Sequence, residues 1–182
     1  MNLQPLRRRA GWLALLATAW LAGCSGKGGT DSVIVSGDVP LVYVKRADSV
    51  RLNPTDGAGF APGGDLMLRE TASPSAPEHN LTAAITQGNG DASDPEVSYD
   101  AKKVVFALRC PTSNTSTVGG QKACTGRWNL WEYDMSSGGL TGGTLRRLTA
   151  STEHDDVDPV YLPGGRGVVF RSEEHTSELQ SR

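Results

Sequence analysis

Two stretches of the sequence follow one pattern: Asp94-Pro-Glu-Val-Ser-Tyr-Asp-Ala-Lys-Lys-Val-Val-Phe106 and Asp158-Pro-Val-Tyr-Leu-Pro-Gly-Gly-Arg-Gly-Val-Val-Phe170. Each opens on Asp-Pro, passes through a polar turn and closes on Val-Val-Phe, and the second lies 64 positions after the first throughout. A short strand, a tight turn and a β-branched strand are typical of a β-hairpin. The two stretches are therefore predicted to be equivalent hairpins of a repeated unit.

Matching segments also precede each hairpin. Asn80-Leu-Thr82 and Arg147-Leu-Thr149 lie directly upstream, and two apolar runs, Leu66-Met-Leu68 and Asn129-Leu-Trp-Glu-Tyr133, lie further upstream. The short apolar run that follows the turn at Ala61–Gly64, and the two-faced pattern of Asn129–Tyr133, favour strands. The predicted unit is therefore a strand, a second strand, an Asp-Pro corner and a hairpin.

The Asp-Pro pairs are predicted to be corners between strands. Asp94 before Pro95, and Asp158 before Pro159, would fix each corner through hydrogen bonds from side chain to backbone. A further strand is expected at Val39–Val44. No amphipathic helix is expected between positions 30 and 170, because Gly, Pro, Asn, Asp and Ser interrupt the sequence too often. The fold class is predicted to be all-β.

The repeated residues resemble the WD40-like repeats of Tol-type periplasmic β-propellers, in which Asp-Pro, a strand, Ser-Pro-Asp-Gly-Lys and an apolar strand ending in Phe follow in order. Ser98–Lys102 departs from that turn, because Ala101 replaces the glycine that a left-handed conformation favours. Longer stretches, Trp128–Asp134 among them, resemble exported bacterial proteins with a hydrazine synthase alpha-subunit middle domain. The resemblance implies an incomplete β-propeller over residues 38–170, with about two to three blades.

The segment 1–23 has the order of a signal peptide. The basic residues Arg7–Arg9, the apolar run Trp12–Leu21 and small residues before Cys24 follow one another. The apolar run is about ten residues long, whereas a helix that spans a bilayer needs roughly 20. An export signal is therefore favoured over a permanent transmembrane helix.

The residues Leu21-Ala-Gly-Cys24 resemble the bacterial lipobox, which implies lipid attachment at Cys24 and anchoring to a membrane. The alternative is an ordinary secretory signal with a chance cysteine. Ser25 stands where an Asp would indicate retention at the inner membrane, so the resemblance implies the cell envelope, at the periplasmic side of the outer membrane. Residues 24–37, rich in Gly, Ser, Lys and Thr, are expected to form a flexible tether.

The C-terminal segment Arg171–Arg182 is predicted to be non-native. Its residues from Arg171 to Ser181 resemble the in-frame translation of a sequencing adapter. Such a segment is excluded from fold prediction, which leaves Phe170 as the last residue of the repeat.

Two cysteines remain once Cys24 is assigned to the lipid. Cys110 and Cys124 enclose a loop rich in Thr, Ser and Gly, and in an oxidising compartment they are predicted to form a disulfide. Two independent free thiols are the alternative. The sequence contains no Cys-x-x-Cys-His, so covalent haem attachment within this chain is not predicted.

An acidic cluster at Glu153–Asp158 is the densest group of candidate metal ligands. Asp155 and Asp156 are weak candidates for calcium, which takes carboxylate and carbonyl oxygens. The spacing lacks the Gly and the terminal Glu of an EF-hand loop. The favoured interpretation is that Asp158 fixes its corner and that the other carboxylates are solvated, so no metal is predicted.

An aromatic cluster offers a second candidate. Trp128, Trp131 and Tyr133 are close enough in sequence to form a stacking surface for a sugar or an aromatic ligand. Their alternation along one strand favours packing in the core instead.

Motifs for catalysis are missing from the sequence: it has no Gly-x-Ser-x-Gly, His-Glu-x-x-His, Walker or dinucleotide pattern. A formal net charge of −2 without a basic cluster argues against nucleic-acid binding. The predicted function is a binding or assembly scaffold in the cell envelope, with a membrane-inserted lipid, a protein partner and no cofactor in this segment. The alternative is a subunit of a haem-dependent, hydrazine synthase-like redox enzyme, with c-type haem supplied by a missing region or a partner.

Overall fold

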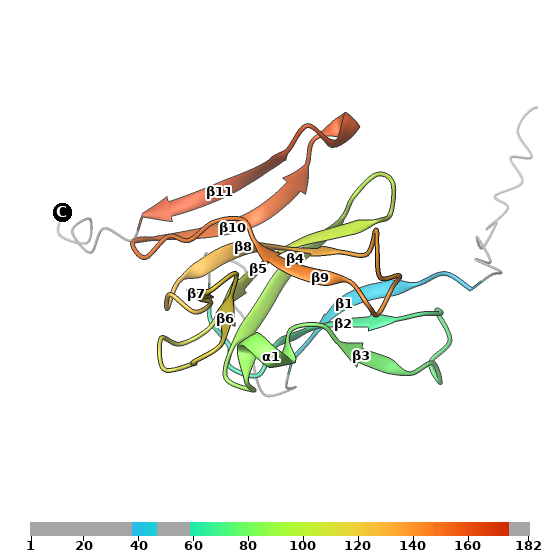
Figure 1. The fold of residues 1–182 in the computed structure, drawn as a ribbon, viewed down its shortest axis with the longest axis horizontal. Coiled ribbons are helices and arrows are strands. Elements are labelled where there is room, and N and C mark those ends of the chain that lie inside the picture. Colours follow the sequence, from blue (N-terminus) through green and yellow to red (C-terminus); the bar gives the residue numbers. More distant parts are fainter. Residues whose placement is uncertain (1–37, 47–58, 175–182) are drawn as a thin grey trace, which may run out of the picture. The chain divides into compact units, whose positions relative to one another are not determined.

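The computed structural model describes residues 38–46 and 59–174, and these residues form an all-β structure (Figure 1). The lipid-attachment residue Cys24, the signal segment, the tether and residues 175–182 lie outside the described residues. The strands are β1 (Leu41–Lys45), β2 (Asp65–Arg69), β3 (Glu78–Asn80), β4 (Asp91–Val97), β5 (Lys103–Arg109), β6 (Thr117–Val118), β7 (Gln121–Lys122), β8 (Trp128–Asp134), β9 (Thr144–Arg147), β10 (His154–Tyr161) and β11 (Val168–Glu174).

Helical structure is confined to two short turns in the described ranges. α1 (Ala83–Thr86) connects β3 to β4, and a 3-10 turn at Pro163–Gly165 connects β10 to β11. The expectation of strands without an amphipathic helix is thus confirmed for these residues. No helix in the described part of the chain is long and apolar enough to cross a membrane.

The strands form four antiparallel sheets. The largest has the order β4-β5-β8-β9, the first has the order β1-β2-β3, and the last consists of β10 and β11, while β6 and β7 form a small ribbon. β11 runs through Arg171–Glu174, so this strand continues into the segment that the sequence predicted to be non-native.

The four-stranded sheet is buried on both faces. Val104 and Phe106 of β5 share one core cluster with Leu66 and Leu68 of β2, so one face packs on the first sheet. Leu130 of β8 belongs to a second cluster on the opposite face, toward β10. A strand covered on both faces reads as a continuous apolar run, which explains Val-Val-Phe-Ala-Leu in β5.

The two hairpins have the same backbone hydrogen bonds at their turns. The amide of Ser98 donates to the carbonyl of Lys103, and 64 positions later the amide of Leu162 donates to that of Gly167; both distances are 2.9 Å. Ala101 has a φ of 56° and its counterpart Gly165 a φ of 68°. The left-handed residue of the turn is therefore kept although the first unit has alanine there.

The strands before each hairpin are joined in the same way. The amide of Leu66 donates to Oγ1 of Thr82, and the amide of Leu130 donates to Oγ1 of Thr149, both at 3.0 Å. Hence the sequence repeat is also a repeat of hydrogen bonds, in which a threonine just after the second strand of each unit accepts an amide of the first strand.

The Asp-Pro pairs lie inside strands, which corrects the prediction that they form corners. Asp94-Pro95 falls within β4 and Asp158-Pro159 within β10, and at each the strand has one residue more than its partner. Pro has no amide hydrogen for the ladder, and a β-bulge leaves that position unpaired. Asp tolerates the left-handed conformation that the bulge requires, with φ of 51° at Asp94 and 53° at Asp158.

Candidate functional site

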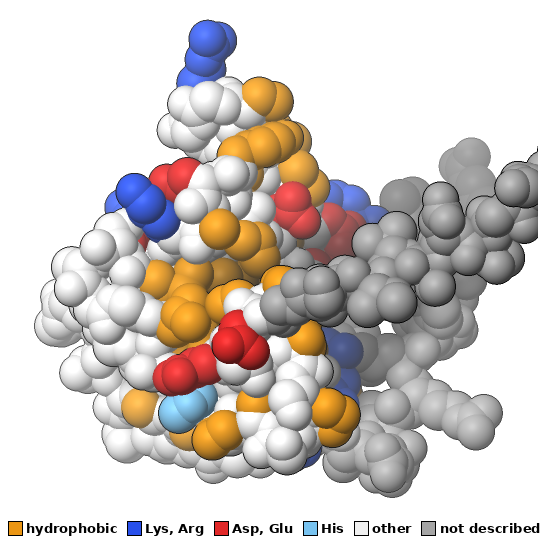
Figure 2. All heavy atoms as spheres, turned by 90° about the vertical axis from the view of Figure 1, so that its right-hand side faces the viewer, with side chains coloured by type: hydrophobic (Ala, Val, Ile, Leu, Met, Phe, Trp, Pro, Cys, Tyr) orange, Lys and Arg blue, Asp and Glu red, His pale blue; other side chains and the backbone are white. Residues whose placement is uncertain are grey.

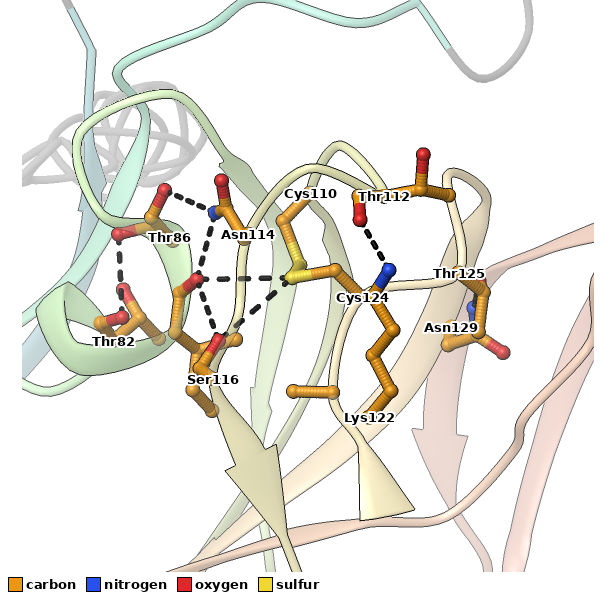
Figure 3. Close-up of a disulfide and its surroundings, with 12 residues drawn as sticks. Thr82, Thr86, Cys110, Thr112, Asn114, Ser116, Lys122, Cys124, Thr125 and Asn129 are labelled. Atoms are coloured by element: carbon orange, nitrogen blue, oxygen red, sulfur yellow. Dashed lines mark hydrogen bonds between the residues drawn. A yellow bond between two sulfur atoms is a disulfide. The ribbon is translucent and has the colours of Figure 1, made fainter.

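The two cysteines predicted to pair form a disulfide, Cys110–Cys124, with the two Cα atoms 5.1 Å apart (Figure 3). Both residues are almost fully buried. The bridge closes the segment that connects β5 to β8 and carries the β6–β7 ribbon. It therefore holds this segment closed at its base.

The disulfide-bridged segment is also bound to α1. Nδ2 of Asn114 donates to the carbonyl oxygens of Ile85, at 3.0 Å, and Thr86, at 2.9 Å, while Oγ of Ser116 donates to the same Ile85 oxygen at 3.3 Å (Figure 3). These bonds satisfy carbonyls at the end of a helix too short to satisfy them itself. The segment and α1 thus form one connected surface at this end of the sheets.

Asp155, a weak candidate for a calcium ligand, is a buried side chain that accepts a backbone hydrogen bond. Its Oδ1 accepts the amide of Trp128 at 2.8 Å, and the side chain is fully buried. Asp91, the counterpart 64 positions earlier, accepts the amide of Ala61 at 3.0 Å and Nε of Arg46 at 2.8 Å. Burial raises the pKa of Asp91 although Arg46 opposes this shift. Asp91 thus ties the β4–β5 hairpin to the segment before β2. Asp155 in the same way ties the β10–β11 hairpin to the first residue of β8.

The other acids of the cluster bind separate partners. Oδ1 of Asp156 accepts the hydroxyl of Ser172 at 2.7 Å, and Oδ2 of Asp158 lies 3.0 Å from Arg171. Within residues 38–46 and 59–174, no three His, Cys, Asp or Glu side chains are grouped as metal ligands. Asp156 and Asp158 therefore link β10 to β11.

The aromatic cluster belongs to the core. Trp128, Trp131 and Tyr133 are all at most 3 % exposed. Trp131 and Tyr133 face the first sheet, whereas Trp128 contacts the edge of the Phe60 ring, with centroids 6.5 Å apart. Core packing, the interpretation favoured by the sequence, is confirmed, and these rings form no open stacking surface.

A groove of about 650 Å³ lies between the outer face of β8–β9 and the β10–β11 pair. Apolar side chains dominate its walls, including Leu130, Leu148, Val168 and Phe170. It reaches the side of the molecule with the β4–β5 and β10–β11 turns, where Figure 2 shows hydrophobic side chains from the top of the view to its centre. This groove is one candidate binding surface, and the surface formed by the disulfide-bridged segment and α1 is the other.

One buried carboxylate, that of Glu132, faces the groove. Its Oε1 accepts Nη2 of Arg146 at 2.8 Å and Nζ of Lys103 at 3.3 Å, and its Oε2 accepts the Tyr161 hydroxyl at 3.1 Å. Nζ of Lys103 also lies 3.1 Å from Oδ2 of Asp134. Glu132 is opposite Arg146 in the ladder, so the register of β8 and β9 builds the pair.

The pKa values of this network follow from its contacts. Burial acts to raise the pKa of Glu132, but the hydrogen bond from Arg146 and the charge of Lys103 outweigh it, and the pKa is lowered. Burial, with the charge of Glu132, raises the pKa of Tyr161. Glu132 is therefore an ionised, fully engaged anchor, unlike a general base, which needs a pKa near neutrality.

Sequence reasoning missed this network. One signal is available: Glu132 is a charged residue between the apolar residues Trp131 and Tyr133 of one predicted strand, and Arg146 follows later in the sequence. Lys103 and Tyr161 carry no comparable signal, because their approach to Glu132 depends on how β5 and β10 pack.

The chain was compared with protein-family models and with curated proteins. No family model matches it, and no curated protein matches it. Function is therefore inferred from the sequence motifs and from the repeat and groove described above.

Proposed function

We propose that the protein is an exported, lipid-anchored scaffold of the cell envelope that acts by binding or assembly. In this proposal the three larger sheets are consecutive blades of an incomplete β-propeller. The observation that carries it is the repeat of hydrogen bonds at a spacing of 64 residues, with the same left-handed turn residue and the same bulge.

The arrangement of strands supports the propeller. A blade of this fold is a four-stranded antiparallel sheet whose strands follow in sequence order, and β4-β5-β8-β9 has that order. The first sheet then corresponds to the last three strands of a preceding blade, and β10–β11 to the first two of a following one. Neighbouring blades of a propeller bury each other's faces. Here one core cluster lies between the first sheet and the four-stranded sheet, and the other lies on the opposite face of the four-stranded sheet.

The partner is expected at the end of the sheets that carries the disulfide-bridged segment between β5 and β8. The long connection among the described residues is the disulfide-bridged segment, residues 110–127 between β5 and β8. In repeat proteins such insertions collect on one face, which is often the binding face. The bonds from Asn114 to α1 give this face a fixed structure.

Lipid anchoring is tested by metabolic labelling with radioactive palmitate in a Gram-negative host. The label is expected in the wild-type protein, in the outer-membrane fraction, and is expected to be lost in Cys24→Ala. Retention of label in Cys24→Ala, or a wild-type protein free of label, would contradict the anchor.

Partner binding is tested by photo-crosslinking in intact cells. A photoreactive residue at Ser113, exposed in the disulfide-bridged segment, is expected to capture a discrete envelope protein. The matched control is Ser75, exposed in the β2–β3 turn at the opposite end of the strands. Equal capture from both positions, or none from Ser113, would argue against a binding face at the disulfide-bridged segment.

A further inference from the structure

One backbone edge of β11 has no neighbouring strand among the described residues, whereas its counterpart β5 has a neighbour on both edges. β5 lies between β4 and β8, whereas β11 pairs only with β10 among the described strands. Val105 and Phe106 of β5 are fully buried, but Val169 and Phe170, 64 positions later, are 55 % and 40 % exposed. β11 thus combines a free backbone edge with uncovered apolar side chains, which is unfavourable in an isolated sheet.

In the preceding unit, the equivalent face is covered by side chains of the next sheet. Leu66 and Leu68 of β2 are fully buried, and Phe106 and Trp131 of the neighbouring sheet belong to the cluster that covers them. Phe106 comes from β5 and Trp131 from β8, which stands beside it in the ladder. Covering this face therefore takes two adjacent strands of the next sheet.

The groove lies on the equivalent face one unit later. Leu130 and Glu132 occupy the positions of Leu66 and Leu68, and Phe170 occupies that of Phe106. A strand equivalent to β8 is the one component that the described residues do not supply beside β11. The empty groove is found where its side chains would lie.

The carboxylate of Glu132 in the groove is compatible with an apolar side chain placed over it. Glu132 is paired with Arg146 and Lys103 of its own sheet and accepts the Tyr161 hydroxyl. An apolar side chain that covers this network would not leave an unpaired buried charge, which is the costly situation.

We propose that the groove and the free edge of β11 are the seat of one further antiparallel strand with the side-chain pattern of β8. The strand pairs with β11 through its backbone and places an aromatic side chain beside Phe170, as Trp131 stands opposite Phe106. This inference rests on the proposed function, because it treats β10–β11 as part of a blade. The occupant is thus a β-strand of this repeat, and neither a small ligand nor a second copy of the chain.

The proposal is tested by extending the full chain. A copy of residues 127–149, which contain β8 and β9, is joined after residue 182 through a Gly/Ser linker. Amide hydrogen exchange of Val168–Phe170, the part of β11 that precedes the segment predicted to be non-native, is then compared with and without the copy in mild detergent. We expect exchange in β11 to slow by about tenfold or more, because an edge strand becomes an inner strand.

The matched control is the same extension with Trp131→Asp and Tyr133→Asp in the copy, which keeps the length and the backbone. It is expected to leave β11 exchange unchanged. No slowing with the intact copy, or equal slowing with the control copy, would overturn the proposal. Light scattering that shows the unextended chain to be a dimer with protected β11 amides would also overturn it. Palmitate labelling does not enter these measurements, so they fail or succeed independently of the anchor.

Discussion

Replacing Phe106 with alanine is expected to destabilise the protein far more than replacing Phe170, although both occupy the same position of the repeat. Phe106 is 0 % exposed and packs in the cluster with Leu66, Leu68 and Trp131. Truncating a fully buried Phe to Ala costs about 3–5 kcal/mol, because contacts are lost and a cavity remains.

The expected cost at Phe170 is smaller for two reasons. The side chain is 40 % exposed, so less apolar area returns to water when it is removed. The space it leaves opens into the groove, so no closed cavity forms. The expected loss is about 1 kcal/mol, in line with partial burial of an aromatic side chain.

The assay is urea-induced unfolding of Phe106→Ala and Phe170→Ala, followed by circular dichroism and extrapolated to water. Tyr99→Ala is the matched control, since this ring is 73 % exposed and its loss is expected to stay within about 0.5 kcal/mol. Equal losses for the two phenylalanine variants would refute the reasoning, because they would mean that β11 is covered in solution as β5 is.

Three further predictions concern single features of the sheets. Replacing Cys110 and Cys124 together by serine is expected to lower the free energy of unfolding by about 3 kcal/mol, and an unfolding midpoint insensitive to reductant would contradict this. Ala101→Gly is expected to raise stability by about 1 kcal/mol and Gly165→Ala to lower it similarly, because both positions have positive φ; opposite signs in the same urea titration would disprove the shared turn. The pKa of Glu132 is lowered from 4.5 in the folded protein, so its ionised form stabilises the fold above that value and the gain is lost as the pH falls through the folded pKa. The melting-temperature difference between wild type and Glu132→Gln is therefore expected to be largest near neutral pH and to shrink below about pH 4, whereas a constant difference would rule out the charge as its cause.

Local patterns were sufficient to predict several of the strands, β2 and β8 among them. The apolar run Leu66–Leu68 and the two-faced pattern of Asn129–Tyr133 depend only on neighbours in sequence, and both segments lie in strands. The same reasoning misplaced the Asp-Pro pairs, because a Pro without an amide hydrogen fits a corner and a bulge equally well. Only the partner strand, with one residue fewer, distinguishes the two.

The groove could not be predicted in this way. Glu132 lies in an apolar strand, and whether such a residue is exposed or buried depends on Arg146 and Lys103 in neighbouring strands and on Tyr161 of β10. These contacts join residues from four strands, so they follow from the register and packing of sheets rather than from any one segment.

The position shared by Leu68 and Glu132 indicates what the groove is suited for. Leu68 is covered by the aromatic side chains of the next sheet, whereas Glu132 brings its counter-charges from its own sheet, Arg146 across on β9 and Lys103 on β5. The charge is thus neutralised before any neighbour arrives, and only the Tyr161 hydroxyl depends on the following strand pair. Three hydrogen bonds and the neighbouring positive charges keep this carboxylate ionised and fixed in position, and its pKa is lowered rather than brought toward neutrality. It offers an approaching strand a neutral surface with one fixed hydrogen bond, which suits a packing interface and not a catalytic site.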